Sequence, residues 1–204
     1  MLKFVALEPV LTQEDTARAA RLVSAGPVSA VSSAGPQWVR EREATALLDR
    51  SAVAFVVAGG EAGIGVLRAE RLQTPGVFEL ALHSADDAAL ETIGVAAGFD
   101  EIVRYLTSTT EVHRIELWFG VYNRLLLDHC LESEHFRCEG MVRDRYFAAG
   151  RYWDGLVWSI TGPRLRAIRE ADPAAAESER AYARTSARLR RAIRDRLADP
   201  EPAS

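Results

Sequence analysis

Residues 52–83 constrain the fold of this chain more than any other segment, because they contain three β-type runs joined by short turns. The runs are rich in β-branched and aromatic side chains and cover residues 53–57, 64–69 and 77–83. Gly59 and Gly60 separate the first two runs, and Thr74-Pro75-Gly76 separates the second from the third. Turns this short join neighbouring antiparallel strands. The segment therefore predicts an antiparallel meander of three strands.

A strand and two helices are predicted before the meander. The strand covers residues 2–7 and is expected to end at Glu8-Pro9. Thr12 and the acidic residues after it are typical of a helix start, and this helix should run to about Val23. Gly, Ser, Ala and Pro residues then indicate a loop up to Pro36. A second helical face follows, formed by Trp38, Ala44, Leu47 and Leu48.

Helices and strands alternate after the meander. The predicted elements are a helix over residues 92–108, a strand at 115–119, a helix at 123–134, and long strands at 136–147 and 152–160, the last two joined at Ala149-Gly150. The helix over 92–108 is apolar almost all round, which indicates packing against a sheet. The element order predicts an α+β fold, with a single mixed, mostly antiparallel sheet flanked by helices. This domain is expected to cover residues 1–162.

The remainder, residues 163–204, is predicted to be a helical C-terminal arm. A short helix is expected to end at Ala171-Asp172-Pro173, and a second helix to cover residues 174–197. The second helix has an apolar stripe formed by Tyr182, Leu189, Ile193 and Leu197. A neighbouring stripe is basic and consists of Arg180, Arg184, Arg188, Arg191 and Arg194. Two interpretations stay open: the arm packs on its own body or on the other chain of a homodimer, or it recruits an acidic partner.

Charge is divided unevenly along the chain. Residues 1–163 hold 15 basic and 22 acidic side chains, whereas residues 164–204 hold 10 arginines and 7 acids. An acidic body argues against nucleic acid as a partner, because nucleic-acid binding depends on Lys and Arg at the phosphates. It favours cationic small molecules or amine-bearing polypeptides.

Cysteine content and hydropathy point to the cytoplasm. Two cysteines, Cys130 and Cys138, are too few for a disulfide framework, so both are expected to be reduced. No run approaches the roughly 18 apolar residues of a membrane span, and the first residues lack the apolar length of a signal peptide. We therefore expect a cytoplasmic protein that does not interact with membranes.

Three motifs carry a family resemblance. They are His-Arg-Ile-Glu-Leu at 113–117, Phe-Arg-Cys-Glu-Gly-Met-Val-Arg-Asp at 136–144 and Gly-Arg-Tyr-Trp-Asp at 150–154. With the element order, they make the chain resemble the GNAT N-acetyltransferases over about residues 2–161, specifically the branch of the ribosomal-protein alanine N-acetyltransferases. The resemblance implies transfer of an acetyl group from acetyl-CoA to a primary amine, either of a small molecule or of a protein N-terminus.

The resemblance also implies where CoA binds. Pantetheine would insert between the separated fourth and fifth strands, against backbone groups of residues 80–84. The pyrophosphate would bind at residues 91–96, where a loop leads into a helix and offers free N–H groups. The predicted CoA-binding residues are Leu82, Ser84, Gly94, Val95, Ala96 and Asn123. Glu91 replaces the usual Gln or Arg of this loop and follows Asp86 and Asp87, so its carboxylate would oppose a diphosphate.

Acetyl transfer also needs a base and an acid. Alternation along the run 77–83 places Glu79 and His83 on one face, and either could deprotonate the amine. The structural alternatives are that Glu79 pairs with an arginine and that His83 caps the strand end. Leu127 stands where the family usually has the hydroxyl that protonates the thiolate. Tyr122 is the candidate replacement, with Tyr146 and Tyr152 as further possibilities.

No metal site is expected. The candidate ligands are His129, Cys130, His135 and Cys138, whose spacing matches no standard zinc pattern.

Two functions remain at this point. The first is an acetyl-CoA-dependent N-acetyltransferase. The second is a GNAT-fold protein that has lost or replaced acetyl transfer and serves as a binding or scaffolding module or runs a different reaction in the same cleft, which Glu91 and Leu127 favour.

Overall fold

A computed structural model of the 204-residue chain describes residues 6–26, 31–58, 63–84, 93–133, 136–161 and 184–195. Its centre is a seven-stranded sheet in the order β1-β2-β3-β4-β5-β7-β6. The strands are β1 (Leu7–Pro9), β2 (Ser51–Val57), β3 (Gly65–Arg71), β4 (Val77–His83), β5 (Arg114–Gly120), β6 (Arg137–Ala148) and β7 (Arg151–Thr161). Neighbouring strands are antiparallel except β4 and β5, which are parallel.

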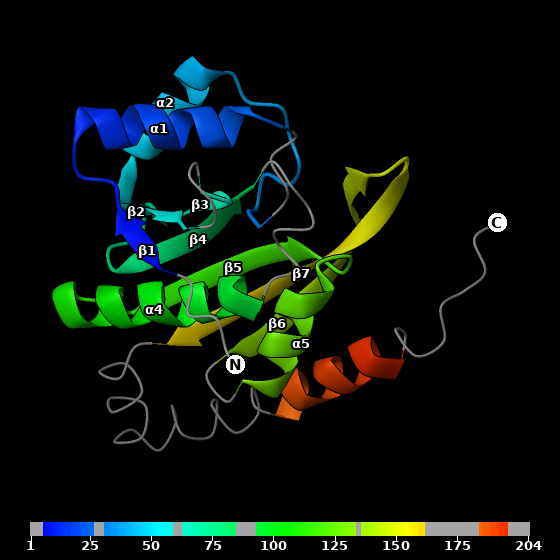
Figure 1. The fold of residues 1–204 in the computed structure, drawn as a ribbon. Helices are drawn as coiled ribbons and strands as arrows, with labels where there is room; N and C mark the ends of the chain where they lie inside the picture. The colour runs from blue at the N-terminus through cyan, green and yellow to red at the C-terminus, as the bar shows by residue number, and fades with distance from the viewer. Residues whose placement is uncertain are drawn as a thin grey trace.

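Helices cover both faces of this sheet (Figure 1). They are α1 (Gln13–Ser24), α2 (Glu41–Asp49), α4 (Ile93–Thr109), α5 (Arg124–Glu132) and a further helix at 184–195. Helices α1 and α2 pack on one face of β2 and β3 through a small core of mostly Ala and Val side chains. Helices α4 and α5 cover the other face, where the larger core contains Phe99, Phe119 and Trp158. The predicted α+β fold with a mixed, mostly antiparallel sheet is confirmed.

Two predictions at the N-terminal end are wrong. Glu8-Pro9 was expected to end the first strand, but β1 runs through Leu7–Pro9 and pairs with β2. Proline is tolerated there because β1 is the edge strand and Pro9 needs to donate no ladder hydrogen bond. Trp38 was expected on a helical face, yet it precedes α2 and is 74% exposed. The helix starts later because Glu43 folds back to accept from the backbone N–H of Arg40 at 2.9 Å.

The β6–β7 hairpin extends from the sheet as a two-stranded ribbon (Figure 1). Its turn consists of Ala149 and Gly150, both at positive φ (51° and 78°), as the sequence predicted for its position. The pairing of β6 with β7 is irregular between Val142 and Tyr146. A bulge of this kind bends a strand and redirects its side chains. Here it turns Arg145 and Tyr146 toward the loop that joins α1 to α2.

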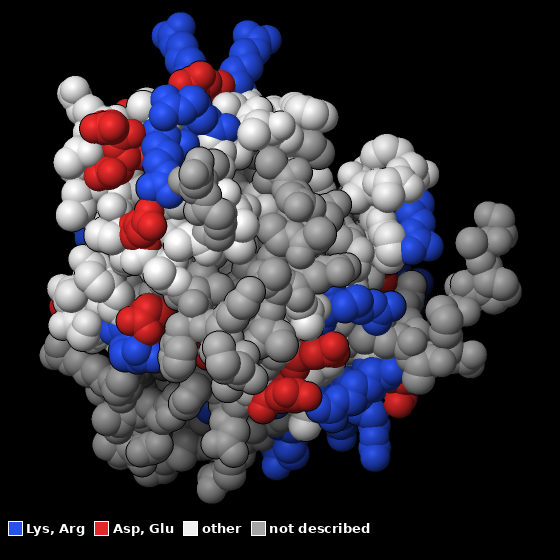
Figure 2. Space-filling view, in the orientation of Figure 1, with Lys and Arg blue, Asp and Glu red and all other residues white. Residues whose placement is uncertain are grey.

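The helix at 184–195 packs on the body of its own chain. Ile193 is 2% exposed and belongs to the larger core, with Leu189 packed against it. Arg190 donates to the carbonyl oxygens of Ser133 (3.3 Å) and Phe136, next to the end of α5. Basic side chains gather on this side of the molecule, at the lower right of Figure 2. Tyr182 and Leu197, the other members of the predicted stripe, lie outside the described residues.

No helix within the described ranges is both long and apolar enough to cross a membrane.

Candidate functional site

Strands β4 and β5 separate before they end. They pair only from Val77 with Arg114 to Leu80 with Leu117, although β4 continues to His83 and β5 to Gly120. The two backbones therefore diverge after Leu80 and leave an opening between parallel strands. A separation at this position agrees with the one implied for residues 80–84.

A segment of the α1–α2 loop occupies this opening. Val31 forms isolated bridges with both Leu82 of β4 and Phe119 of β5. Its carbonyl oxygen accepts from the backbone N–H of Leu82 at 2.9 Å, and the residue is only 1% exposed. No sequence pattern predicts this contact, because Val31 lies in a loop of small residues that is far from both strands in sequence.

Glu79 holds the same loop at a second point. One carboxylate oxygen accepts from the backbone N–H of Ser33 and the other from the Ser33 hydroxyl, both at 2.8 Å. The carboxylate is half-buried. The structural alternative for Glu79 was an ion pair with an arginine. The observed partner is Ser33, which lies 46 residues away in a loop that no sequence pattern connects with Glu79. Glu79 lies on β4 just before the residues at which β4 and β5 separate.

His83 lies on the same face of β4, as the alternation predicted, but in a different environment. Its Nε2 accepts from Nε of Arg68 at 2.9 Å, and Arg68 also forms a 2.7 Å ion pair with Glu70. Burial, and then the charge of Arg68, lower the pKa of His83 to about 3. The ring is therefore neutral at pH 7, and because Nε2 accepts, its proton is assigned to Nδ1. No side chain or backbone group in the described residues bonds to that buried Nδ1.

Carboxylates continue across the sheet on this face. Glu116 of β5 is the register partner of Glu79, and Glu139 of β6 follows further along. Arg114 pairs with both, at 2.7 Å from Glu116 and 2.5 Å from Glu139. Although burial lowers the pKa of Arg114, its hydrogen bonds with the two carboxylates raise it overall. Arg114 offsets only part of the negative charge of this face.

The redirected side chains of β6 fix the α1–α2 loop from the other side. Arg145 donates to the carbonyl of Ser33 at 2.9 Å, and the Tyr146 hydroxyl donates to the carbonyl of Ser32 at 3.0 Å. Burial raises the pKa of Tyr146, so its hydroxyl remains a donor. Gly35 lies against the Tyr146 ring at φ +74°, where an added Cβ would collide with the ring.

The acid candidates are placed differently from one another. Leu127 is fully buried in the core and carries no proton, so this position supplies no acid. Tyr122 lies two residues after the end of β5, with its ring against Gly120 and edge-on to Trp153. Tyr152 is largely exposed near the hairpin tip and pairs with Phe147. Of these tyrosines, Tyr122 lies nearest in sequence to the end of β5, where the opening is.

The predicted CoA contacts are described in part. Gly94, Val95 and Ala96 belong to the first turn of α4, whereas Glu91, Asp86 and Asp87 lie outside the described residues. The Ser84 hydroxyl donates to the carbonyl of Ile64 at 2.7 Å. Asn123 is buried at the start of α5.

Cys130 and Cys138 are buried thiols whose pKa values are raised by burial, to about 11 for Cys138. His129 instead faces Asp100 at 3.3 Å. Among the residues that the structure describes, no three His, Cys, Asp or Glu side chains are grouped to hold a metal ion.

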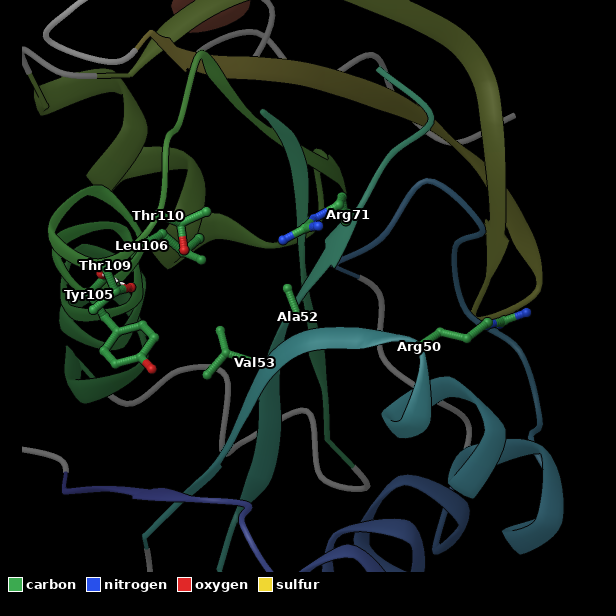
Figure 3. A pocket seen from close by; sticks show the side chains of 8 residues that line it. All are labelled: Arg50, Ala52, Val53, Arg71, Tyr105, Leu106, Thr109 and Thr110. Atoms are coloured by element: carbon green, nitrogen blue, oxygen red, sulfur yellow. Dashed lines mark hydrogen bonds between the residues drawn. The ribbon is translucent and has the colours of Figure 1, made fainter. Parts of the chain in front are cut away.

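A separate cavity of about 380 Å³ lies at the opposite end of the sheet (Figure 3). Its lining includes Val53 near the start of β2, Arg71 at the end of β3, and Tyr105 of α4. These residues are on the side of the sheet that α4 covers: Arg71 is the register partner of the buried Phe78, whereas Glu79, the next residue of β4, faces the other side. The cavity therefore adds nothing to the site around Glu79.

Comparison with solved structures identifies the fold. Spermidine N-acetyltransferase from Vibrio cholerae, solved with CoA and spermine, aligns with a TM-score of 0.59 and 17% identity over 79% of this chain and 98% of that one. A putative phosphinothricin N-acetyltransferase aligns at 0.58 and 12%, over 76% and 98%. A probable GNAT-family acetyltransferase from Chromobacterium violaceum aligns at 0.51 and 17%, over 78% and 83%. No protein-family model and no curated protein matches the sequence. The fold is that of the GNAT acetyltransferases.

Proposed function

We propose that this protein is an acetyl-CoA-dependent N-acetyltransferase that acts on a primary amine of a small molecule or of a protein N-terminus. One observation carries the proposal: the Glu79 carboxylate lies on β4 just before β4 and β5 separate, in a fold shared with acetyltransferases. A candidate base and an opening for the acyl donor therefore stand on one strand.

We assign Glu79 as the general base. A primary amine is an ammonium ion at neutral pH, and it attacks a thioester only after it has lost a proton. A carboxylate accepts that proton directly or through a water molecule. His83 is a weaker candidate, because burial and then the charge of Arg68 lower its pKa to about 3, so the ring does not accept a proton at neutral pH. Its neutral ring carries a proton at Nδ1 and can only donate there.

The remaining steps need a donor for the developing oxyanion and an acid for the leaving group. The amine nitrogen bonds to the acetyl carbon, the carbon–sulfur bond breaks, and CoA leaves as a thiolate that takes up a proton. We assign the backbone N–H of Leu82 to the thioester oxygen and the hydroxyl of Tyr122 to the thiolate. The first turn of α4, with Gly94, Val95 and Ala96, would receive the pyrophosphate. Ser84 and Asn123 are the remaining proposed CoA contacts.

The charge of the open sheet face supports an amine acceptor. Glu79, Glu116 and Glu139 lie along it, with Arg114 between the last two. Among the described residues, Glu79 accepts from Ser33 and forms no ion pair with an arginine, and a carboxylate without a countercharge attracts ammonium groups. The spermidine N-acetyltransferase with a similar fold was solved with spermine, which is itself a polyamine.

The test is the variant Glu79→Gln, which keeps the shape of the side chain and removes the base. We expect kcat/KM for acetyl transfer to an amine to fall by roughly 10²–10⁴-fold. Glu111→Gln, at an exposed carboxylate before β5, is the control and should behave like the unmodified protein. Unchanged kcat/KM in Glu79→Gln would refute the assignment.

A second candidate function follows from two features of the site. Leu127 occupies the position expected for an acid, and Val31 already fills the opening between the strands. A GNAT-fold module that binds a partner without transferring an acetyl group fits both. Calorimetric titration with acetyl-CoA separates the candidates, because absence of binding at millimolar ligand excludes the transferase.

A further inference from the structure

We infer that residues 31–35 of the α1–α2 loop are an internal occupant of the donor site, and that acyl-CoA binds only after Val31 has left the opening between β4 and β5. The inference rests on the proposed function, since it concerns the donor of that reaction. Its structural basis is the pair of bridges from Val31 to Leu82 and Phe119.

The first step is competition for one hydrogen-bond donor. The N–H of Leu82 points into the opening and already donates to the carbonyl of Val31 at 2.9 Å. A backbone N–H makes one strong hydrogen bond. The carbonyl of a thioester or of pantetheine therefore cannot use this donor while Val31 holds it. Val31 also fills space, because it is 1% exposed and belongs to the main core.

The second step is that the same loop engages the proposed base. Ser33 donates its N–H and its hydroxyl to the two oxygens of the Glu79 carboxylate, each at 2.8 Å. Departure of the loop would therefore free the donor site and the base together. With the loop in place, the donor site holds no thioester and the proposed base is engaged by Ser33.

The third step identifies what holds the loop. Tyr146 donates to the carbonyl of Ser32 at 3.0 Å, and Arg145 donates to the carbonyl of Ser33 at 2.9 Å. These residues come from the bulged part of β6, so the loop is fixed between β4 and β6. Weakening this attachment should raise the fraction of molecules with an open donor site. Apparent affinity for the donor rises in proportion to that fraction.

Tyr146→Phe is the sharpest test, because it removes one attachment without changing the packing of the ring. The carbonyl of Ser32 keeps a second donor, the N–H of Gly35 at 3.1 Å, so no polar group is orphaned. We expect acetyl-CoA to bind about fivefold more tightly, the effect of losing one hydrogen bond of ordinary net strength from the closed form. We also expect faster hydrogen exchange at the Leu82 amide. Tyr105→Phe, a tyrosine on α4 remote from the loop, is the matched control and should change neither quantity.

The possible failures are distinguishable. If Tyr146→Phe binds acetyl-CoA as the unmodified protein does, with unchanged exchange at Leu82, the displacement is overturned and the proposed function stands. If none of the three proteins binds acetyl-CoA at millimolar concentration, the proposed function is overturned and the displacement with it. A saturating ligand that leaves the amide of Ser33 as protected as before would also overturn the displacement.

Discussion

The contact between Arg68 and His83 makes the stability of this protein depend on pH. The pKa of His83 is about 3, because burial and then the charge of Arg68 disfavour the imidazolium ion. An unfolded chain protonates the same ring near its ordinary value of 6.5. Unfolding therefore takes up a proton between pH 6.5 and about pH 3, and the stabilisation present above pH 6.5 is lost progressively as the pH falls through this range.

We predict that His83→Gln weakens this pH dependence. Glutamine offers an oxygen acceptor to Nε of Arg68 but has no proton to gain. Between pH 6.5 and pH 5, the unmodified protein should lose about 2 kcal/mol more unfolding free energy than the variant. Urea titrations at the two pH values measure the difference. His113→Gln, at an exposed histidine, is the control. Equal losses in His83→Gln and the unmodified protein would contradict the prediction.

Single residues also show what sequence patterns can and cannot predict. Alternation placed Glu79 and His83 on one face correctly, because side-chain direction in a strand depends only on neighbouring residues. The partners of these side chains were not predictable. Ser33 reaches Glu79, and Arg68 reaches His83, through the pairing of distant segments. The same limit applies to Val31, which no local pattern connects with β4 and β5.

At the scale of elements, regular segments were predicted well and their ends less well. The strand over 77–83 and the helix near 92–108 match β4 and α4, because long apolar patterns dominate their local structure. The extent of β1 and the start of α2 were wrong, because an edge position tolerates Pro9 and a capping contact delays the helix. Such context depends on where an element sits in the fold.

The β6–β7 turn offers a stabilising substitution. Ala149 has φ 51°, in the left-handed region that disfavours a residue with a plain Cβ, and Gly150 follows at φ 78°. Asn-Gly is the preferred sequence for a two-residue hairpin turn of this kind. We predict that Ala149→Asn raises the unfolding free energy by about 0.5–1 kcal/mol. Thermal denaturation measures the change.

A substitution at the neighbouring glycine provides the control for this turn. Gly150→Ala should destabilise the protein through backbone strain alone, since no atom lies within 4 Å of the added Cβ. A lower melting temperature for Ala149→Asn would contradict the prediction, because it would mean that the positive φ at position 149 does not disfavour alanine relative to asparagine.

At the scale of the whole molecule, the helix at 184–195 contributes to the core formed by the elements before it. The helix at 184–195 inserts Ile193 beside α5, and Arg190 satisfies carbonyls at the end of that helix. The interpretation in which the arm packs on its own body therefore describes these residues. A homodimer formed through the arm stays a prediction, which the oligomeric state of a protein shortened after residue 183 would test.

We predict that Ile193→Ala lowers the unfolding free energy by about 2–4 kcal/mol, because it leaves a cavity in the main core. Arg188→Ala, at an exposed position of the same helix, should change it by less than about 0.5 kcal/mol. Urea denaturation of both variants compares the two positions. Similar stabilities would mean that the helix is not seated on the core in solution.

The strand order has a consequence for synthesis. β7 is the last strand that the structure describes, yet it lies between β5 and β6. Until residues 151–161 have been translated, β5 lacks one neighbour and β6 has no partner in this sheet. A nascent chain therefore exposes unpaired strand edges, which favour aggregation. A translation product that stops before residue 151 would be a client for chaperones and proteases rather than a smaller working domain.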